Sequence, residues 1–134
     1  MAKRFHFEII TPERPRYNGD IEAVTVPGSE GQMGLLAEHA AILALTEPGV
    51  LTVRMPGKEM RMAVGGGFVK MSNNRCVCLV DFAETADEIN AEKARAERIA
   101  VERELAHPMA LEQREPLRLR LKEQLARLEV AGAK

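Results

Sequence analysis

The side chains that could carry out chemistry are few in this sequence, and they form no recognisable catalytic set. His39 follows Glu38, and no serine, cysteine or lysine has a general base at a spacing typical of nucleophilic enzymes. Asp81 and Glu84 lie close together, but paired carboxylates are common at the edge of a domain. The sequence therefore predicts a protein that is not itself an enzyme.

The two cysteines, Cys76 and Cys78, are separated by one residue, so on a strand they would share one face. Such close neighbours rarely meet disulfide geometry. A metal site would need further ligands, and His6, His39 and His107 are scattered along the chain. We therefore expect two buried free thiols and no metal.

Glycine is concentrated in two clusters. The second cluster, 65–67, lacks the spacing of a phosphate-binding loop and opens no helix. It predicts a strand corner that needs either a positive φ or a close backbone approach. Gly28, Gly31 and Gly34 fit either a ligand-binding nest or tight turns between strands, and turns are favoured.

Composition excludes several classes of function. With a net charge of −1, the chain lacks the excess of basic residues that nucleic-acid binding requires. It has no Trp and one Tyr, so it also lacks aromatic side chains on which bases could stack. No apolar run approaches the roughly 20 residues that a membrane helix needs. Glu8 interrupts the apolar N-terminal run, so we expect no signal peptide and a cytoplasmic protein.

The elements that hold these residues change in character near residue 84. Apolar residues at 5, 7 and 9 alternate with His6, Glu8 and Ile10, which is typical of a strand. Segments 49–54 and 59–64 flank Pro56-Gly57, and segments 68–71 and 76–80 flank another turn, so each pair predicts a hairpin. These short strands predict an antiparallel β-sandwich, or a flattened barrel, over residues 1–84.

Residues 85–134 are much richer in charge and predict two helices. Thr85 and Glu88 match a capping box, so the first helix is expected to begin at Thr85 and to end at His107-Pro108. Four leucines mark one face of a second helix: Leu117, Leu121, Leu125 and Leu128. Pro116 is expected in the first turn of that helix, with 109–115 as a loop or a separate turn. The predicted fold class is α+β in two segregated parts, a sandwich (1–84) and an antiparallel helical hairpin (85–134).

The second helix also carries a row of cations, which we call the basic stripe: Arg114, Arg118, Lys122 and Arg127. One interpretation is a solvated face paired with Glu115, Glu123 and Glu129. The other is a surface that docks on an acidic partner.

Four motifs in register resemble the epsilon subunit of the F-type ATP synthase, which is called delta in mitochondria. They lie at 26–40, at Pro48-Gly49, at 65–69 and at 77–84. The resemblance covers nearly the whole chain, including the helical tail.

The resemblance implies a non-catalytic subunit of the central stalk of a proton-translocating rotary motor. Its partners would be the gamma subunit and the c-ring, and it would lie peripherally on the cytoplasmic face of a bacterial inner membrane. Four residues would lie at the ring end of the sandwich: Ser29, Glu30, Gly31 and Gln32. His39 would lie near gamma. The C-terminal helices would form a mobile regulatory part, whose basic stripe reaches the catalytic alpha/beta head when they extend and restrains ATP hydrolysis.

Some family members hold a regulatory ATP at the start of the first helix, through a motif with Asp and Arg. Here Asn90 and Lys93 stand in their places. Lysine cannot reproduce the planar two-pronged grip of arginine. No firm cofactor site is expected, and the candidates for ATP are Glu84, Ile89, Asn90, Lys93 and Ala94.

Two readings from other classes compete with this one. A free-standing adaptor, built of a β-sandwich and a helical hairpin, would bind some other partner and leave ATP hydrolysis unaffected. An enzyme with a carbohydrate or acyl-group site on the sandwich would need an acid, a base and an aromatic platform, which the sequence does not offer.

Overall fold

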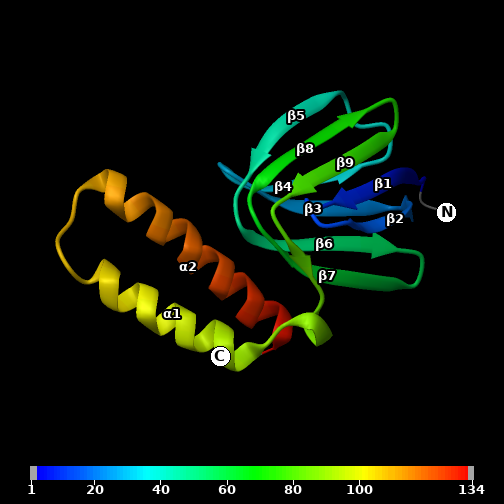
Figure 1. The fold of residues 1–134 in the computed structure, drawn as a ribbon. Helices are drawn as coiled ribbons and strands as arrows, with labels where there is room; N and C mark the ends of the chain where they lie inside the picture. The colour runs from blue at the N-terminus through cyan, green and yellow to red at the C-terminus, as the bar shows by residue number, and fades with distance from the viewer. Residues whose placement is uncertain (1–2, 133–134) are drawn as a thin grey trace.

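The structure, a computed structural model, describes residues 3–132, which form a β-sandwich followed by two long helices (Figure 1). The strands are β1 (Phe5–Ile10), β2 (Pro15–Ile21), β3 (Ala23–Gly28), β4 (Gly31–Leu36), β5 (Ile42–Thr46), β6 (Gly49–Met55), β7 (Lys58–Val64), β8 (Gly67–Ser72), β9 (Arg75–Val80) and β10 (Ala83–Glu84). The predicted fold class is confirmed.

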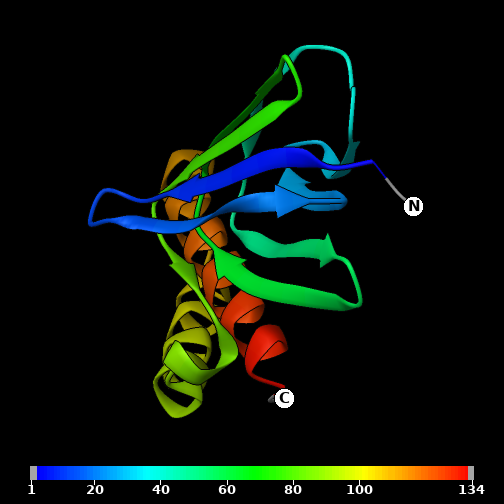
Figure 2. The same cartoon turned by 90° about the vertical axis from the view of Figure 1, so that its right-hand side faces the viewer.

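The strands form one hydrogen-bonded sheet that folds over on itself, as the two views show (Figures 1 and 2). Its order is β10-β7-β6-β3-β5-β8-β9-β1-β2, with β4 paired to β3. Pairing is antiparallel except between β1 and β9, which run parallel. Both predicted hairpins, β6–β7 and β8–β9, are present.

Alternation along the strands places the core between the two layers. On β1, Phe5, Phe7 and Ile9 are buried, while the residues between them are half-buried. Cys76 and Cys78 are buried free thiols, as expected. Burial of such aliphatic and aromatic side chains is the main source of stability in a domain of this kind.

The second glycine cluster serves close packing. A Cβ on Gly67 would lie 1.9 Å from the carbonyl oxygen of Leu79, and a Cβ on Gly65 would lie 2.8 Å from the Phe82 ring. None of the three glycines has a positive φ. Of the two alternatives for this corner, close backbone approach is therefore the correct one.

The first helical feature begins where predicted but is short. Thr85 donates its N–H to the Glu88 carboxylate at 2.9 Å, yet this cap opens only a 3-10 turn, Ala86–Glu88. Ile89 returns to extended backbone, and α1 (Ala91–Leu105) begins after Asn90, whose side chain accepts from the Lys93 N–H at 3.0 Å. The capping box at Thr85 is confirmed, but the long helix expected from it begins only at Ala91, because a second capping residue, Asn90, follows the first.

The second long helix, α2 (Leu111–Ala131), begins earlier than predicted and contains Pro116. The expected loop at 109–115 was therefore wrong for most of its length. Gln113 caps the helix by accepting from the Ala110 N–H at 3.2 Å. Proline in the second turn deprives only the Glu112 carbonyl of its partner, and Glu112 is exposed, so water can replace that bond.

The two helices lie antiparallel, with α2 between α1 and the strands (Figure 1). α2 packs on β6 and β7 through a small apolar cluster of Ala63, Ala126 and Val130, with Val50, Phe82 and Ile89 at its margin. Of the predicted leucine face, Leu128 is buried and Leu125 is exposed. The division into separate domains at residue 84 stays a prediction.

Candidate docking surfaces and the contact between hairpin and sandwich

A row of apolar side chains crosses the outer face of the sandwich. Strand register places Leu45 beside Phe68, Phe68 beside Leu79, and Leu79 beside Ile10. Their neighbours along each strand point into the core, so these four point outward. We call Ile10, Leu45, Phe68 and Leu79 the outer row.

Exposure along the outer row is high for residues of this kind. Leu45 is 67% exposed and Leu43, two residues before it on β5, is 70% exposed. Beside the row lies a shallow hollow of about 400 Å³, lined in part by Pro12, Gly66 and Phe68. A contiguous exposed apolar surface on a folded domain is typical of an interface with a partner.

Sequence reasoning missed the outer row, although a signal was present. The segment 42–45 is an unbroken apolar run, whereas a strand with one solvated face alternates. Such a run predicts a strand that is covered on both faces.

The turn between β3 and β4 projects from the sandwich. Its four predicted ring-end residues are all exposed to some degree: Ser29, Glu30, Gly31 and Gln32. The Ser29 N–H donates to the Leu45 carbonyl at 3.2 Å, which fixes the turn beside the outer row. Gly31 has a φ of 120°, so this glycine serves the turn.

His39 is exposed at the other end of β5. Its Nδ1 lies 2.7 Å from the Ala40 carbonyl oxygen. The preceding residue, Glu38, donates its N–H to Asn74 Oδ1 at 2.7 Å, which places His39 near the β8–β9 turn. The structure therefore separates His39 from the β3–β4 turn.

Three cations of the basic stripe bind acids of the sandwich. Lys122 Nζ lies 2.5 Å from Glu47 Oε1, and Arg118 Nη2 lies 3.1 Å from Glu47 Oε2. Hydrogen bonds from these two cations lower the pKa of Glu47. Arg127 Nε donates to Glu84 at 2.7 Å, and its guanidinium lies 4.0 Å from the centre of the Phe82 ring.

The remaining contacts of the stripe stay within the hairpin. Arg114 donates to the Leu105 carbonyl at 3.2 Å, and Arg118 also pairs with Glu115 at 2.5 Å. Of the three partners expected for a solvated face, only Glu115 pairs with the stripe among the residues that the structure describes. Glu129 pairs with Arg61 on β7 at 2.6 Å.

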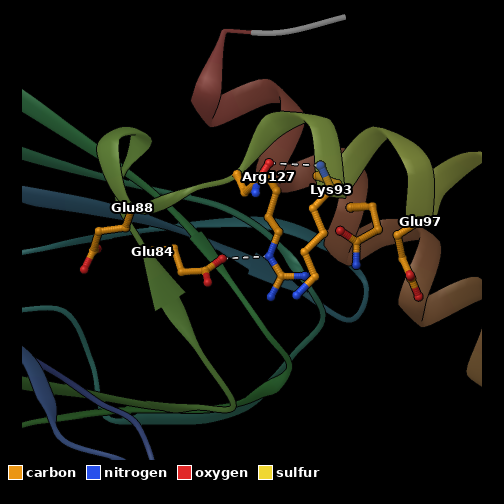
Figure 3. A pocket seen from close by; sticks show the side chains of 8 residues that line it. Glu84, Glu88, Lys93, Glu97 and Arg127 are labelled. Atoms are coloured by element: carbon orange, nitrogen blue, oxygen red, sulfur yellow. Dashed lines mark hydrogen bonds and ion pairs between the residues drawn. The ribbon is translucent and has the colours of Figure 1, made fainter.

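The residues at the start of α1 line a hollow of about 390 Å³ between the helices and the sandwich (Figure 3). The lining includes four of the ATP candidates, Glu84, Asn90, Lys93 and Ala94. The fifth, Ile89, packs on the apolar cluster instead.

The arginine that lines this hollow is already bound to a carboxylate of the chain. Three carboxylates line it, from Glu84, Glu88 and Glu97, against two cations, Lys93 and Arg127. Figure 3 shows Arg127 turned toward Glu84, to which it is hydrogen-bonded. A polyanionic ligand would have to compete with Glu84 for Arg127, and the carboxylates of Glu88 and Glu97 are themselves paired with Arg16 and Arg120.

A further ion pair ties the linker before α1 to β2. Glu88 binds Arg16, and Arg14 lies 3.7 Å from it. The Arg16 side chain and the Thr85 N–H lower the pKa of Glu88 to about 2.

Comparison with known proteins decides the family. Residues 4–86 match the family model described as "ATP synthase, Delta/Epsilon chain, beta-sandwich domain". The chain is 40% identical to an ATP synthase epsilon chain from Desulforamulus reducens, over 78% of this chain and 80% of that one. The chain belongs to the ATP synthase delta/epsilon family. Membership confirms the resemblance and, with it, the prediction of a non-catalytic subunit.

A further relative and two solved structures match along the helices as well. An epsilon chain from Bacillus pumilus is 34% identical over 97% of this chain and 98% of its own length. A chain in the Euglena gracilis mitochondrial ATP synthase (OSCP/F1/c-ring, rotational state 1) has the same fold, with a TM-score of 0.80 over 98% of this chain and 82% of that one, at 22% identity. A chain in the central stalk/c-ring structure from Tetrahymena thermophila gives a TM-score of 0.65 over 97% of this chain and 98% of that one, at 14% identity. No helix within residues 3–132 is both long and apolar enough to cross a membrane.

Proposed function

We propose that this chain is a central-stalk subunit of a rotary, proton-translocating ATP synthase. It would connect the catalytic head to the c-ring, as a peripheral subunit on the cytoplasmic face of a bacterial membrane. Membership of the delta/epsilon family supports this assignment, and the outer row is the observation that carries it. The alternative of a free-standing adaptor protein is not favoured, because the sequence similarity extends over almost all of the Bacillus pumilus epsilon chain.

The outer row is the proposed docking surface for the gamma subunit. It is apolar and built on paired strands, and the adjacent hollow can receive a side chain from a partner. Interfaces draw most of their binding energy from a few central side chains, each worth about 2 kcal/mol or more, and aromatic residues are enriched in interface cores. Phe68 lies in the middle of the row and is the expected anchor.

The β3–β4 turn is the proposed contact with the c-ring, and His39 is proposed to lie near gamma. The turn projects beside the outer row, so a partner on that row and a second partner at the turn would be neighbours. His39 lies at the other end of β5, near the β8–β9 turn. These two placements rest on the family resemblance together with exposure.

The helical hairpin is proposed to restrain ATP hydrolysis. α2 carries its cations in a row, and three of them already bind carboxylates within this chain. If the helices extend, the same cations can bind carboxylates on the catalytic head. No nucleotide forms part of this proposal, because Arg127, which lines the hollow at the start of α1, is bound to Glu84.

Deletion of residues 85–134 tests the inhibitory role. The sandwich carries the proposed stalk contacts, so we expect the truncated chain to assemble into the synthase and ATP hydrolysis to rise several-fold. The measurement is the ATPase rate of reconstituted complexes, with the full-length chain as control. Loss of assembly on truncation, or an unchanged rate in assembled complexes, would contradict this division of labour.

A further inference from the structure

We propose that Glu47 and Glu84 form an ionic clasp that fastens the helical hairpin to the sandwich and competes with any acidic partner for the same cations. The clasp is defined as Glu47 with Arg118 and Lys122, and Glu84 with Arg127. The attachment of the hairpin to the sandwich by the clasp is a property of the isolated chain. Only the effect of the clasp on ATP hydrolysis rests on the proposed function.

Glu47 is held in position by its backbone. It lies between β5 and β6, and its N–H donates to the Pro27 carbonyl at 2.9 Å. Gly49 follows closely, and a Cβ there would lie 2.6 Å from the Pro27 side chain. This connection is tightly packed, so Glu47 is already ordered before it binds α2. Binding therefore costs less conformational entropy than it would for a residue on a mobile loop.

Both oxygens of Glu47 are used. Oε1 accepts from Lys122 and Oε2 accepts from Arg118, and these cations are one helical turn apart on α2. The Glu47 side chain is only 20% exposed, against 39% and 44% for the two cations. Charge-assisted hydrogen bonds at a partly shielded carboxylate are stronger than isolated surface pairs, which contribute little.

The second half of the clasp is shielded from water in a similar way. The Arg127 side chain is 23% exposed and that of Glu84 is 31% exposed. Arg127 also lies over the Phe82 ring, so leaving Glu84 would forfeit two interactions at once. Both Glu84 and Phe82 belong to the end of the sandwich.

Little apolar surface lies beneath the clasp. The cluster that joins α2 to the sandwich has three buried members, two of them alanines, and its larger side chains, Phe82 and Ile89, are only partly buried. Alanine and valine bury far less apolar area than the phenylalanines and leucines of the main core. The ion pairs therefore make up a large share of the attachment, and screening them should loosen it.

Competition follows from the use of the same cations in both states. Arg118, Lys122 and Arg127 belong to the basic stripe that the proposed function assigns to an acidic surface of the catalytic head. A cation bound to Glu47 or Glu84 cannot bind a second carboxylate in the same geometry. The attached hairpin is therefore the non-inhibitory state, and removal of a clasp carboxylate favours release.

The test measures the distance between hairpin and sandwich in the full chain. Spin labels are placed on cysteines introduced at His107, between the helices, and at Lys58, at the β6–β7 turn, and the distance distribution is recorded by pulsed electron resonance. Both sites are exposed, and the native cysteines are buried. Glu47→Gln should raise the ratio of released to attached hairpin by about tenfold, which corresponds to about 1.4 kcal/mol.

Two controls separate the clasp from general damage. Glu59→Gln removes an exposed carboxylate on β7 that makes no ion pair within residues 3–132, and it should leave the distances unchanged. In the chain without Glu47→Gln, raising NaCl from about 50 mM to about 1 M shortens the screening length from above roughly 10 Å to about 3 Å and should release the hairpin. Glu47→Gln should blunt this response, and its effect should be non-additive with Lys122→Gln.

Distances that are the same in Glu47→Gln and in the parent chain would overturn the clasp, as would a distribution that does not respond to salt. In the reconstituted synthase, Glu47→Gln should strengthen inhibition of ATP hydrolysis. Release in the isolated chain with no change in hydrolysis would support the clasp and count against the proposed inhibitory role. The two failures are thus distinguishable.

Discussion

Gly67 shows how a single residue can fix the corner between β7 and β8. A Cβ there would lie 1.9 Å from a main-chain oxygen, which cannot move aside by changing a rotamer. Gly67→Ala is therefore expected to destabilise the fold by about 3 kcal/mol, at the upper end of the usual cost of overpacking. For a chain of this length the melting temperature should fall by about 10 °C.

Gly34→Ala is the matched control for Gly67→Ala. Gly34 lies in β4, has no positive φ, and has no atom within 4 Å of an added Cβ. The two variants are compared by thermal unfolding followed by circular dichroism. Equal melting temperatures would contradict the role of close packing at this corner.

At the residue scale, the sequence predicts inward-facing residues well and charge partners poorly. Phe5, Phe7 and Ile9 alternate strictly and are buried. The partner of Arg118 and Lys122, however, lies more than 70 residues away in a short connection between strands. Local pattern carries no information about such a pair, because it depends on how the hairpin lies on the sandwich.

Pro116 is the residue of α2 that fits its element least well. It removes one hydrogen bond from the second turn of the helix. Pro116→Ala should stabilise the helix by up to about 3 kcal/mol, the difference in helix propensity between these residues. The change should appear as slower amide hydrogen exchange across residues 111–120.

The control for Pro116→Ala is Leu111→Ala, which alters an exposed side chain in the same half of α2 and keeps the proline. It should leave exchange in that segment nearly unchanged. Faster exchange in Pro116→Ala than in the parent chain would mean that the proline stabilises the helix start, which is the opposite of the expected effect.

At the element scale, hairpins were predictable and helix starts were not. Asn73 and Asn74 both have positive φ, which asparagine tolerates, so these residues predict the β8–β9 turn directly. The helix starts involve competing caps, because Thr85 and Asn90 both carry good capping side chains. The extended backbone at Ile89, between them, ends the first turn, and that side chain packs on the cluster beneath α2.

The attachment of the hairpin to the sandwich should depend on pH. Arg16 lowers the pKa of Glu88 to about 2, and Arg118 and Lys122 lower that of Glu47. A carboxyl group with a lowered pKa favours the attached state above its ordinary pKa of about 4.5, and that contribution is lost as the pH falls through the lowered pKa, which for Glu88 is about 2. We therefore expect the hairpin to stay attached from about pH 7 to about pH 5 and to loosen progressively below that.

Amide hydrogen exchange of α2, measured between about pH 7 and about pH 3 and corrected for intrinsic rates, follows this loosening. The double variant Glu47→Gln with Glu88→Gln lacks both carboxylates and should show a weaker dependence on pH. Equal pH dependence in the parent chain and the double variant would assign the effect to other groups.

At the scale of the whole molecule, the order of sandwich and hairpin was predictable from composition. Glycine-marked strands and a charge-rich tail occupy separate parts of the sequence, and in the structure the strands precede the two long helices. The mode of docking was not predictable. It follows from β6 and β7 lying side by side at one end of the folded sheet, with Glu47 and Glu84 at their margins.

Binding of the gamma subunit by the outer row is the central claim. Size-exclusion chromatography of this chain mixed with gamma from the same source tests it most directly, with Phe68→Asp as the interface variant and Leu111→Asp as an exposed apolar control on the hairpin. We predict a one-to-one complex for the parent chain and the control, and binding weakened about 30-fold or more by Phe68→Asp. Separate peaks for the folded parent chain and gamma would contradict the stalk assignment, and a complex undisturbed by Phe68→Asp would contradict the outer row as its interface.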